Sequence, residues 1–187
     1  MIHMVQNKNN IELEIISVLI KNNTHLREIA RILKESHSTI LRKIRKLEKE
    51  NVLDYKEEGK NKIYFLKKTI EAKNYVFSTE NYKLNQILKK YSFLRTIIEK
   101  IQKDNRIKLA ILFGSYAKGI AKTESDIDVY IETENINIKK ELNPINTKLS
   151  IKIGRYNKSN LLIKEIEKNH VILKGVELYY EKNKIFE

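Results

Sequence analysis

The 187-residue chain has no cysteine, no tryptophan, one proline and only five glycines. Without cysteine, disulfides and thiolate chemistry are excluded, which fits a reducing compartment, and we expect a cytoplasmic protein. The scarcity of glycine and proline argues against long flexible linkers. No apolar stretch approaches the roughly 18 residues of a membrane span, and the first ten residues have no signal-peptide core. We therefore expect no membrane-embedded segment.

Positive charge is in clear excess. The chain has 37 lysines and arginines against 24 aspartates and glutamates, a net charge of +13. Such an excess predicts an anionic partner, such as a nucleic acid, a nucleotide or a membrane surface, and by itself does not choose among them. Hydrophobic residues make up 41% of the chain, enough for packed cores.

Helical periodicity dominates the first fifty residues. Apolar side chains recur every three or four positions in residues 11–23, 24–36 and 38–51, so each segment is expected to form a helix. Thr24 is the expected N-cap of the second helix.

A β-hairpin is predicted directly after the third helix. Two β-rich runs flank "EEGKN", where Gly59 can supply a positive φ. Three helices followed by a hairpin resemble the winged helix-turn-helix domains of MarR-like and ArsR-like transcription regulators. The resemblance covers residues 11 to about 68.

This resemblance implies that the third helix enters the major groove of double-stranded DNA while the hairpin reaches the flanking backbone. A homodimer would place two such helices on two half-sites. The alternative is a basic, solvated helix in a winged helix used only for protein contacts. The expected DNA-binding residues are Ser38, Thr39, Arg42, Lys43 and Lys46 on the helix and Lys60 and Lys62 on the hairpin.

The segment after the hairpin is mostly helical in pattern. The stretch "FSTEN" predicts a break or a cap in it. We therefore expect a first domain over residues 1–70, a connecting segment over 71–81 and a second domain over 82–187.

Two of the five glycines fall in "GSYAKGIAKTESDID", residues 114–128, directly after the apolar run "LAILF". The apolar run predicts a buried strand. Residues 126–131 alternate, with Asp126 and Asp128 on one face of a second strand. A Gly-Ser turn at a helix start offers N–H groups and a hydroxyl to a polyphosphate. Two carboxylates on one strand face suit a divalent cation that bridges phosphate oxygens.

Gly-Ser, ten residues and Asp-x-Asp resemble the signature of the polymerase-β-like nucleotidyltransferase superfamily. With this resemblance the expected fold class is α+β, an N-terminal winged helix plus a C-terminal domain whose mixed β-sheet is flanked by helices. It implies Asp126 and Asp128 as catalytic residues that bind Mg²⁺, and a nucleoside triphosphate, ATP as first choice. The implied nucleotide-binding residues are Gly114, Ser115, Lys118 and Ser125.

The following strand departs from that pattern. Active members carry a third carboxylate there, as metal ligand or general base. Here the strand is "LSIKIG", residues 149–154, and we expect Ser150 and Lys152 to face the aspartates. Glu132 shares the face of Asp128 but lies about 13 Å along the strand, too far to share one ion.

Two functions stay open. In one, the chain is a DNA-binding regulator whose nucleotidyltransferase-like domain binds nucleotide and Mg²⁺ with weakened catalysis. In the other, it is an active transferase that moves a nucleoside monophosphate onto a protein or small molecule, with the winged helix as a docking module. Some minimal relatives are antitoxins that transfer AMP to tyrosines of HEPN-type toxins, so the resemblance also implies a toxin–antitoxin role with such a toxin as partner.

Overall fold

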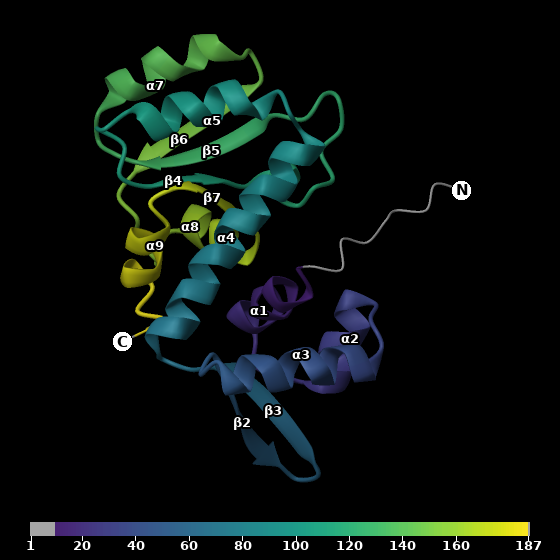
Figure 1. The fold of residues 1–187 in the computed structure, drawn as a ribbon. Coiled ribbons are helices and arrows are strands. Elements are labelled where there is room, and N and C mark those ends of the chain that lie inside the picture. Colours follow the sequence, from purple (N-terminus) through teal and green to yellow (C-terminus); the bar gives the residue numbers. More distant parts are fainter. Residues whose placement is uncertain (1–9, 187) are drawn as a thin grey trace. The chain divides into compact units, whose positions relative to one another are not determined.

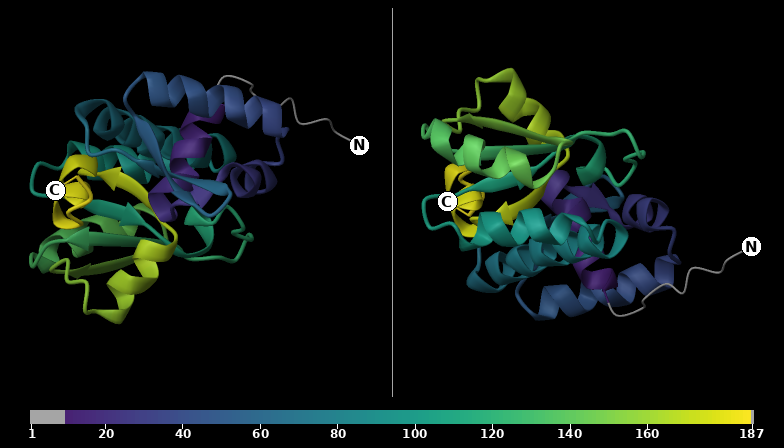
Figure 2. Two further views of the ribbon diagram at one scale, coloured as in Figure 1. Left: turned by 90° about the horizontal axis from the view of Figure 1, so that it is seen from below. Right: turned by 90° about the horizontal axis from the view of Figure 1, so that it is seen from above.

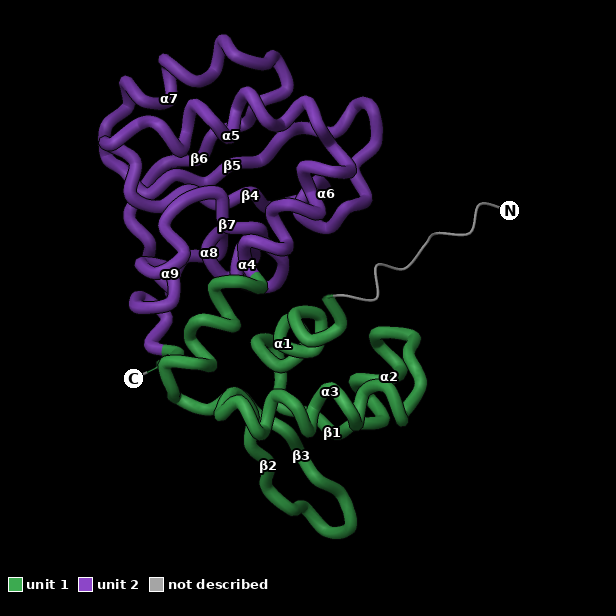
Figure 3. The backbone as a smooth tube through the Cα atoms, in the orientation of Figure 1, with its two compact units in different colours: residues 1–79, 185–187 green, residues 80–184 purple. Residues whose placement is uncertain are grey.

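The computed structural model describes residues 10–186. These fall into two compact units (Figure 3): the first ends at Thr79 and takes in the segment from Ile185, and the second spans Glu80–Lys184. The first is a winged helix and the second is built on a mixed sheet with flanking helices, so the predicted fold class is confirmed. No helix among residues 10–186 is both long and apolar enough to cross a membrane.

The first unit is a helical cluster with a small antiparallel sheet (Figure 1). Its sheet has the order β1–β3–β2, and β2 and β3 form the predicted hairpin around Gly59, whose φ is +60°. The core is lined by isoleucines and leucines from all three helices, which removes their apolar surface from water. The elements are α1 (Ile11–Lys21), β1 (Thr24–His25), α2 (Leu26–Leu33), α3 (His37–Lys49), β2 (Leu53–Glu58) and β3 (Asn61–Leu66).

The starts of α2 and α3 are capped by different means. The Oγ of Ser36 accepts the N–H of Thr39 at 3.1 Å, which satisfies a free donor in the first turn of α3. The expected cap at Thr24 is wrong, because Thr24 pairs with Tyr64 in the sheet. The cap of α2 is instead His25, whose Nδ1 accepts the N–H of Glu28 at 3.1 Å.

Helix α4 (Ile70–Lys90) is continuous, so the break predicted at "FSTEN" is wrong. Thr79, at the centre of this stretch, is fully buried, and its hydroxyl donates to the carbonyl of Tyr75 at 2.8 Å. A threonine that bonds back to the preceding turn satisfies its polar group inside a helix and need not end it.

The second unit has a four-stranded sheet with the order β6–β5–β4–β7, in which only β5 and β6 are parallel (Figures 1 and 2). Helices α5 and α7 lie on one face of the sheet, and α8 and α9 lie on the other. The elements are α5 (Leu94–Lys103), β4 (Ala110–Leu112), α6 (Gly114–Ala117), β5 (Ile127–Glu132), α7 (Ile136–Leu142), the 3-10 turn η1 (Asn143–Ile145), β6 (Leu149–Gly154), α8 (Leu161–Lys168), β7 (Val171–Lys174) and α9 (Val176–Lys182).

Alternation along β5 divides the core between the two faces of the sheet. Ile127, Val129 and Ile131 are buried in the cluster that α5 and α7 close. Tyr130 points to the opposite face, where its ring packs edge-on against Tyr156 and its hydroxyl donates to a backbone carbonyl at 2.8 Å. Asp128 shares this second face, because side chains two residues apart point the same way.

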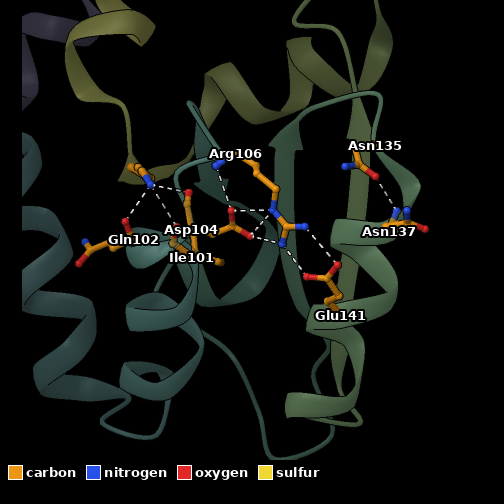
Figure 4. A network of polar contacts seen from close by, with 8 residues as sticks. Ile101, Gln102, Asp104, Arg106, Asn135, Asn137 and Glu141 are labelled. Atoms are coloured by element: carbon orange, nitrogen blue, oxygen red, sulfur yellow. Dashed lines mark hydrogen bonds and ion pairs between the residues drawn. The ribbon is translucent and has the colours of Figure 1, made fainter.

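A polar network ties the connection between α5 and β4 to α7 (Figure 4). The guanidinium of Arg106 contacts the carboxylate of Asp104 at 2.6 Å and that of Glu141 on α7 at 2.5 Å. The ammonium of Lys174 donates to the carbonyls of Gln102 and Asp104 at 2.8 Å each. A cation there satisfies carbonyls left free at the C-terminus of α5.

Replacing Ser36 by alanine should loosen α3. The substitution Ser36→Ala removes the acceptor for the N–H of Thr39, a loss of about 1 kcal/mol. Hydrogen exchange of α3 amides should then accelerate about fivefold. Ser36→Asp retains a capping oxygen and is the matched control. Equal protection in Ser36→Ala and the parent would contradict the role of the cap.

Candidate functional site

The turn after β4 lies directly against Asp128. The N–H of Phe113 donates to the carbonyl of Asp128 at 2.9 Å, which continues the β4–β5 pairing into the turn. Gly114 follows with a φ of +69°, and a Cβ built on it would lie 2.5 Å from Oδ2 of Asp128. Glycine is required here both for its backbone conformation and for the close approach. The structure thus brings Gly114 and the adjoining Ser115 to Asp128.

The two aspartates have different surroundings. Asp126 is exposed and precedes the first residue of β5, whereas Asp128 is half-buried within the strand. Burial raises the pKa of Asp128, and the charge of Asp126 raises it further. A hydrogen bond from Ser150 and the charge of Lys152 partly offset this increase in the pKa. The pair therefore favours a neighbouring cation.

Strand β6 places a hydroxyl beside Asp128. In the parallel register Asp128 pairs with Ser150, and Tyr130 pairs with Lys152. Paired residues of parallel strands point to the same face, so Ser150 and then Lys152 border the aspartates on the side of β6. Glu132 is engaged elsewhere, because its Oε1 accepts from Lys182 at 2.9 Å.

The carboxylates suit a cation that arrives with a polyphosphate. Among residues 10–186 no group of three or more aspartate, glutamate or histidine side chains could hold a metal ion. Asp126 and Asp128 supply two carboxylates. Mg²⁺ is commonly held by one or two carboxylates together with substrate phosphates and waters. The donor set therefore fits a cation shared with a nucleotide and does not fit an all-protein cage.

The other two candidate nucleotide-binding residues make local contacts. Lys118 is the C-cap of α6, and its ammonium lies 3.7 Å from a carboxylate oxygen of Glu165 on α8. The Oγ of Ser125 accepts the N–H of Lys122 at 2.9 Å, so Ser125 shapes the loop that leads into Asp126.

A basic groove of about 530 Å³ runs along α3. Its lining includes three residues that were not among the candidates, Leu41, Arg45 and Lys49. The signal for the two basic residues was present, because positions 38, 42, 45 and 49 are separated by four, three and four residues and so share one helical face. The groove is lined by Ser38, Leu41, Arg42, Arg45, Lys46 and Lys49.

Two α3 lysines hold an acidic residue of α1. The ammonium groups of Lys43 and Lys46 each lie 3.0 Å from Oε1 of Glu12. Burial raises the pKa of Glu12, but the hydrogen bonds and charges of the lysines outweigh it, and the pKa lies below its ordinary value. The Lys43 side chain is only 20% exposed. Lys43 therefore supports the packing of α1 on α3, and Lys46 is the more accessible of the two.

The hairpin presents its two candidate lysines differently. Lys60 is exposed in the turn, whereas the ammonium of Lys62 lies 3.7 Å from the centroid of the Tyr55 ring. This cation–π contact positions Lys62 on the face of the hairpin that carries Tyr55.

Residues 95–181 match the family model described as polymerase beta, nucleotidyltransferase. This part of the chain is a nucleotidyltransferase-like domain. The match runs from α5 to α9 and contains Gly114, Asp126 and Asp128. It agrees with the resemblance found in the spacing of these residues.

A search of solved structures returned the adhesin competence repressor from Streptococcus pyogenes, with a TM-score of 0.37 and 19% sequence identity. The alignment covers 51% of this chain and 78% of that chain. The score is too low to argue a common fold, so the description of the first unit as a winged helix rests on its own elements. No curated protein matches the chain.

Neutralising Asp128 should stabilise the free protein at neutral pH. Because its pKa is raised in the folded state, the parent loses stability as the pH rises above 3.8, the ordinary aspartate value, through the folded-state pKa. Asp128→Asn removes this loss, so its melting temperature should exceed that of the parent at pH 7. The difference in melting temperature should vanish below pH 3.8, where the side chain of Asp128 is protonated and therefore as neutral as the asparagine that replaces it.

The exposed Glu124 provides the matched control. Glu124→Gln removes the same formal charge from the connection that leads into β5 and should leave the melting temperature unchanged across the pH range. Thermal melts of the parent and both variants at a series of pH values measure these differences in melting temperature. A parent as stable as Asp128→Asn at pH 7 would show that Asp128 carries no such electrostatic strain.

Proposed function

We propose that this chain is a DNA-binding regulator whose nucleotidyltransferase-like domain binds a nucleoside triphosphate with Mg²⁺ and transfers weakly. The observation that carries the proposal is the pairing of Asp128 with Ser150. In this register β6, the strand on which active relatives supply a carboxylate, carries the hydroxyl of Ser150 beside Asp128, followed by the ammonium of Lys152.

Binding and transfer make different demands on this site. The Gly114–Ser115 turn offers N–H groups and a hydroxyl to phosphate oxygens, and Asp126 and Asp128 hold the accompanying cation. When bound, Mg²⁺ would neutralise the charge between the carboxylates and the phosphates. Transfer also requires removal of a proton from the attacking hydroxyl, and neither Ser150 nor a protonated Lys152 accepts one at neutral pH.

The first unit supports the DNA-binding part. Arg42, Arg45 and Lys49 lie on one exposed face of α3, and guanidinium and ammonium groups bind phosphates and guanine edges. Ser38 and Thr39 lie in the first turn of α3, the end of a recognition helix that commonly meets base edges. Lys60 at the hairpin tip is available to the flanking backbone. DNA is the anionic partner that this charge pattern fits best.

The second candidate is an active transferase that modifies a protein, such as a HEPN-type toxin, or a small molecule. The raised pKa of Asp128 favours it, because a carboxylate with raised pKa is a better proton acceptor. Asp128 would then act as the base in place of the missing third carboxylate, and the cation would lie on Asp126 and the substrate phosphates, because a cation bound to Asp128 would lower its pKa again.

Removing the two α3 arginines should abolish most DNA binding. Arg42→Ala with Arg45→Ala should weaken binding of duplex DNA by well over tenfold at about 50 mM salt, and the salt slope should fall by about two units. Gel shift across salt concentrations measures both. Lys89→Ala with Lys100→Ala removes the same charge from exposed positions of the second unit and is the control. If the arginine variant shifts DNA as the control does, α3 is not the recognition helix.

A third carboxylate at position 150 should increase transfer. Ser150→Asp puts an acid beside Asp128 without changing the register of β6, so binding of Mn²⁺–ATP should tighten and transfer of labelled AMP should rise above the weak level of the parent. Ser150→Asn has similar size without the charge and should do neither. Calorimetry reports binding, and incorporation of label reports transfer. Strong transfer by the parent that Asp126→Asn abolishes would refute weak catalysis and favour the second candidate.

A further inference from the structure

The outer edge of β6 is open to another strand. Within the described residues β6 pairs with β5 and forms an end of the sheet. The N–H of Ile127 donates to the carbonyl of Lys148 at 2.8 Å, and this bond fixes which residues of β6 pair with β5 through their backbone groups. Ser150 and Lys152 therefore direct their N–H and C=O groups toward β5, and Ile151 directs its N–H and C=O outward. An edge with free donors and acceptors is a template for strand addition.

A groove of about 320 Å³ runs along this edge. Lys139 of α7, Lys148 and Lys152 line it, and Asp126 is the one acidic residue among the lining side chains. The ammonium of Lys148 donates to the carbonyl of Thr123, a contact that leaves its charge uncompensated. Asp128, which borders Ser150, adds a second carboxylate beside the groove, so the local charge is three positive groups against two negative groups and stays positive.

The charges decide between possible occupants of this edge. Two copies of the chain paired edge to edge would bring their lysines together, which disfavours self-association. A nucleic acid would meet the lysines but would not match the alternating backbone donors and acceptors of β6. An extended peptide with acidic side chains satisfies both the backbone groups and the lysines.

We propose that the open edge of β6 is a docking site for an acidic, extended segment of a partner protein, which adds as a further strand. In the added strand alternate side chains face the same side of the sheet as Ser150 and Lys152. Acidic residues at these positions lie opposite Lys152. The site goes beyond the proposed function, since it requires neither nucleotide binding nor transfer.

A peptide probe tests the proposal on the full-length protein. The probe is a fluorescent peptide of about eight residues, within the usual range of strand lengths, that alternates glutamate with valine. Fluorescence anisotropy should show binding that weakens with salt. Lys139→Gln with Lys152→Gln should weaken it by about tenfold or more. Lys89→Gln with Lys164→Gln, a change of equal charge at exposed positions outside the groove, should bind as the parent does.

Two further probes separate strand addition from simple charge attraction. The same peptide N-methylated at alternate residues keeps its carboxylates but cannot pair along one edge, and it should bind at least about tenfold more weakly. A single-stranded oligothymidine of matched charge should also bind more weakly than the peptide. Equal binding of the N-methylated peptide, tighter binding of the oligothymidine or an unaffected Lys139→Gln/Lys152→Gln variant would each overturn the proposal. The lysines would then only protect the edge from aggregation.

Discussion

The contact between the backbone of Gly114 and the carboxylate of Asp128 is the constraint on which the candidate site depends. Position 114 requires glycine, because only glycine readily adopts the positive φ found there and lacks the Cβ that would clash with the carboxylate. The backbone bond from Phe113 to Asp128 holds the turn at that distance. One consequence is electrostatic: the turn buries part of a carboxylate already near Asp126, and the resulting repulsion is relieved by whatever cation occupies the site. The close approach of the Gly114 turn to Asp128 therefore both shapes the site and favours the binding of a cation there.

The balance between binding and catalysis depends on one neighbouring strand. The Gly-Ser turn and the two aspartates lie on β4, α6 and β5, whereas the residue that would complete a catalytic set belongs to β6. Under the proposed function, a single side chain at position 150 would thus change the chemistry and leave the proposed phosphate-binding turn intact. Cation-dependent nucleotide binding without efficient transfer is a state that this arrangement allows.

Much of the fold and of the candidate site could be predicted from the sequence, because local patterns indicate them. These patterns are the alternation of β5, the turn at Gly59 and the spacing from Gly114 to Asp128. The errors arose where tertiary structure overrode local preference. Thr24 pairs in a sheet that the local pattern did not reveal, and Thr79 satisfies its hydroxyl within α4. The link between Glu12 and Lys43 spans 31 positions, and the grouping of lysines at the edge of β6 depends on strand order, so neither has a local signature.

The double ion pair of Glu12 changes how DNA binding by α3 would respond to salt. Lys46 already has an intramolecular counterion at 3.0 Å. If a phosphate takes the place of Glu12, the contact releases a protein carboxylate rather than a dissolved ion. The measured salt slope counts only dissolved ions. The number of phosphates that α3 contacts would thus exceed the number that the slope reports, and Glu12→Gln would bring the two numbers together.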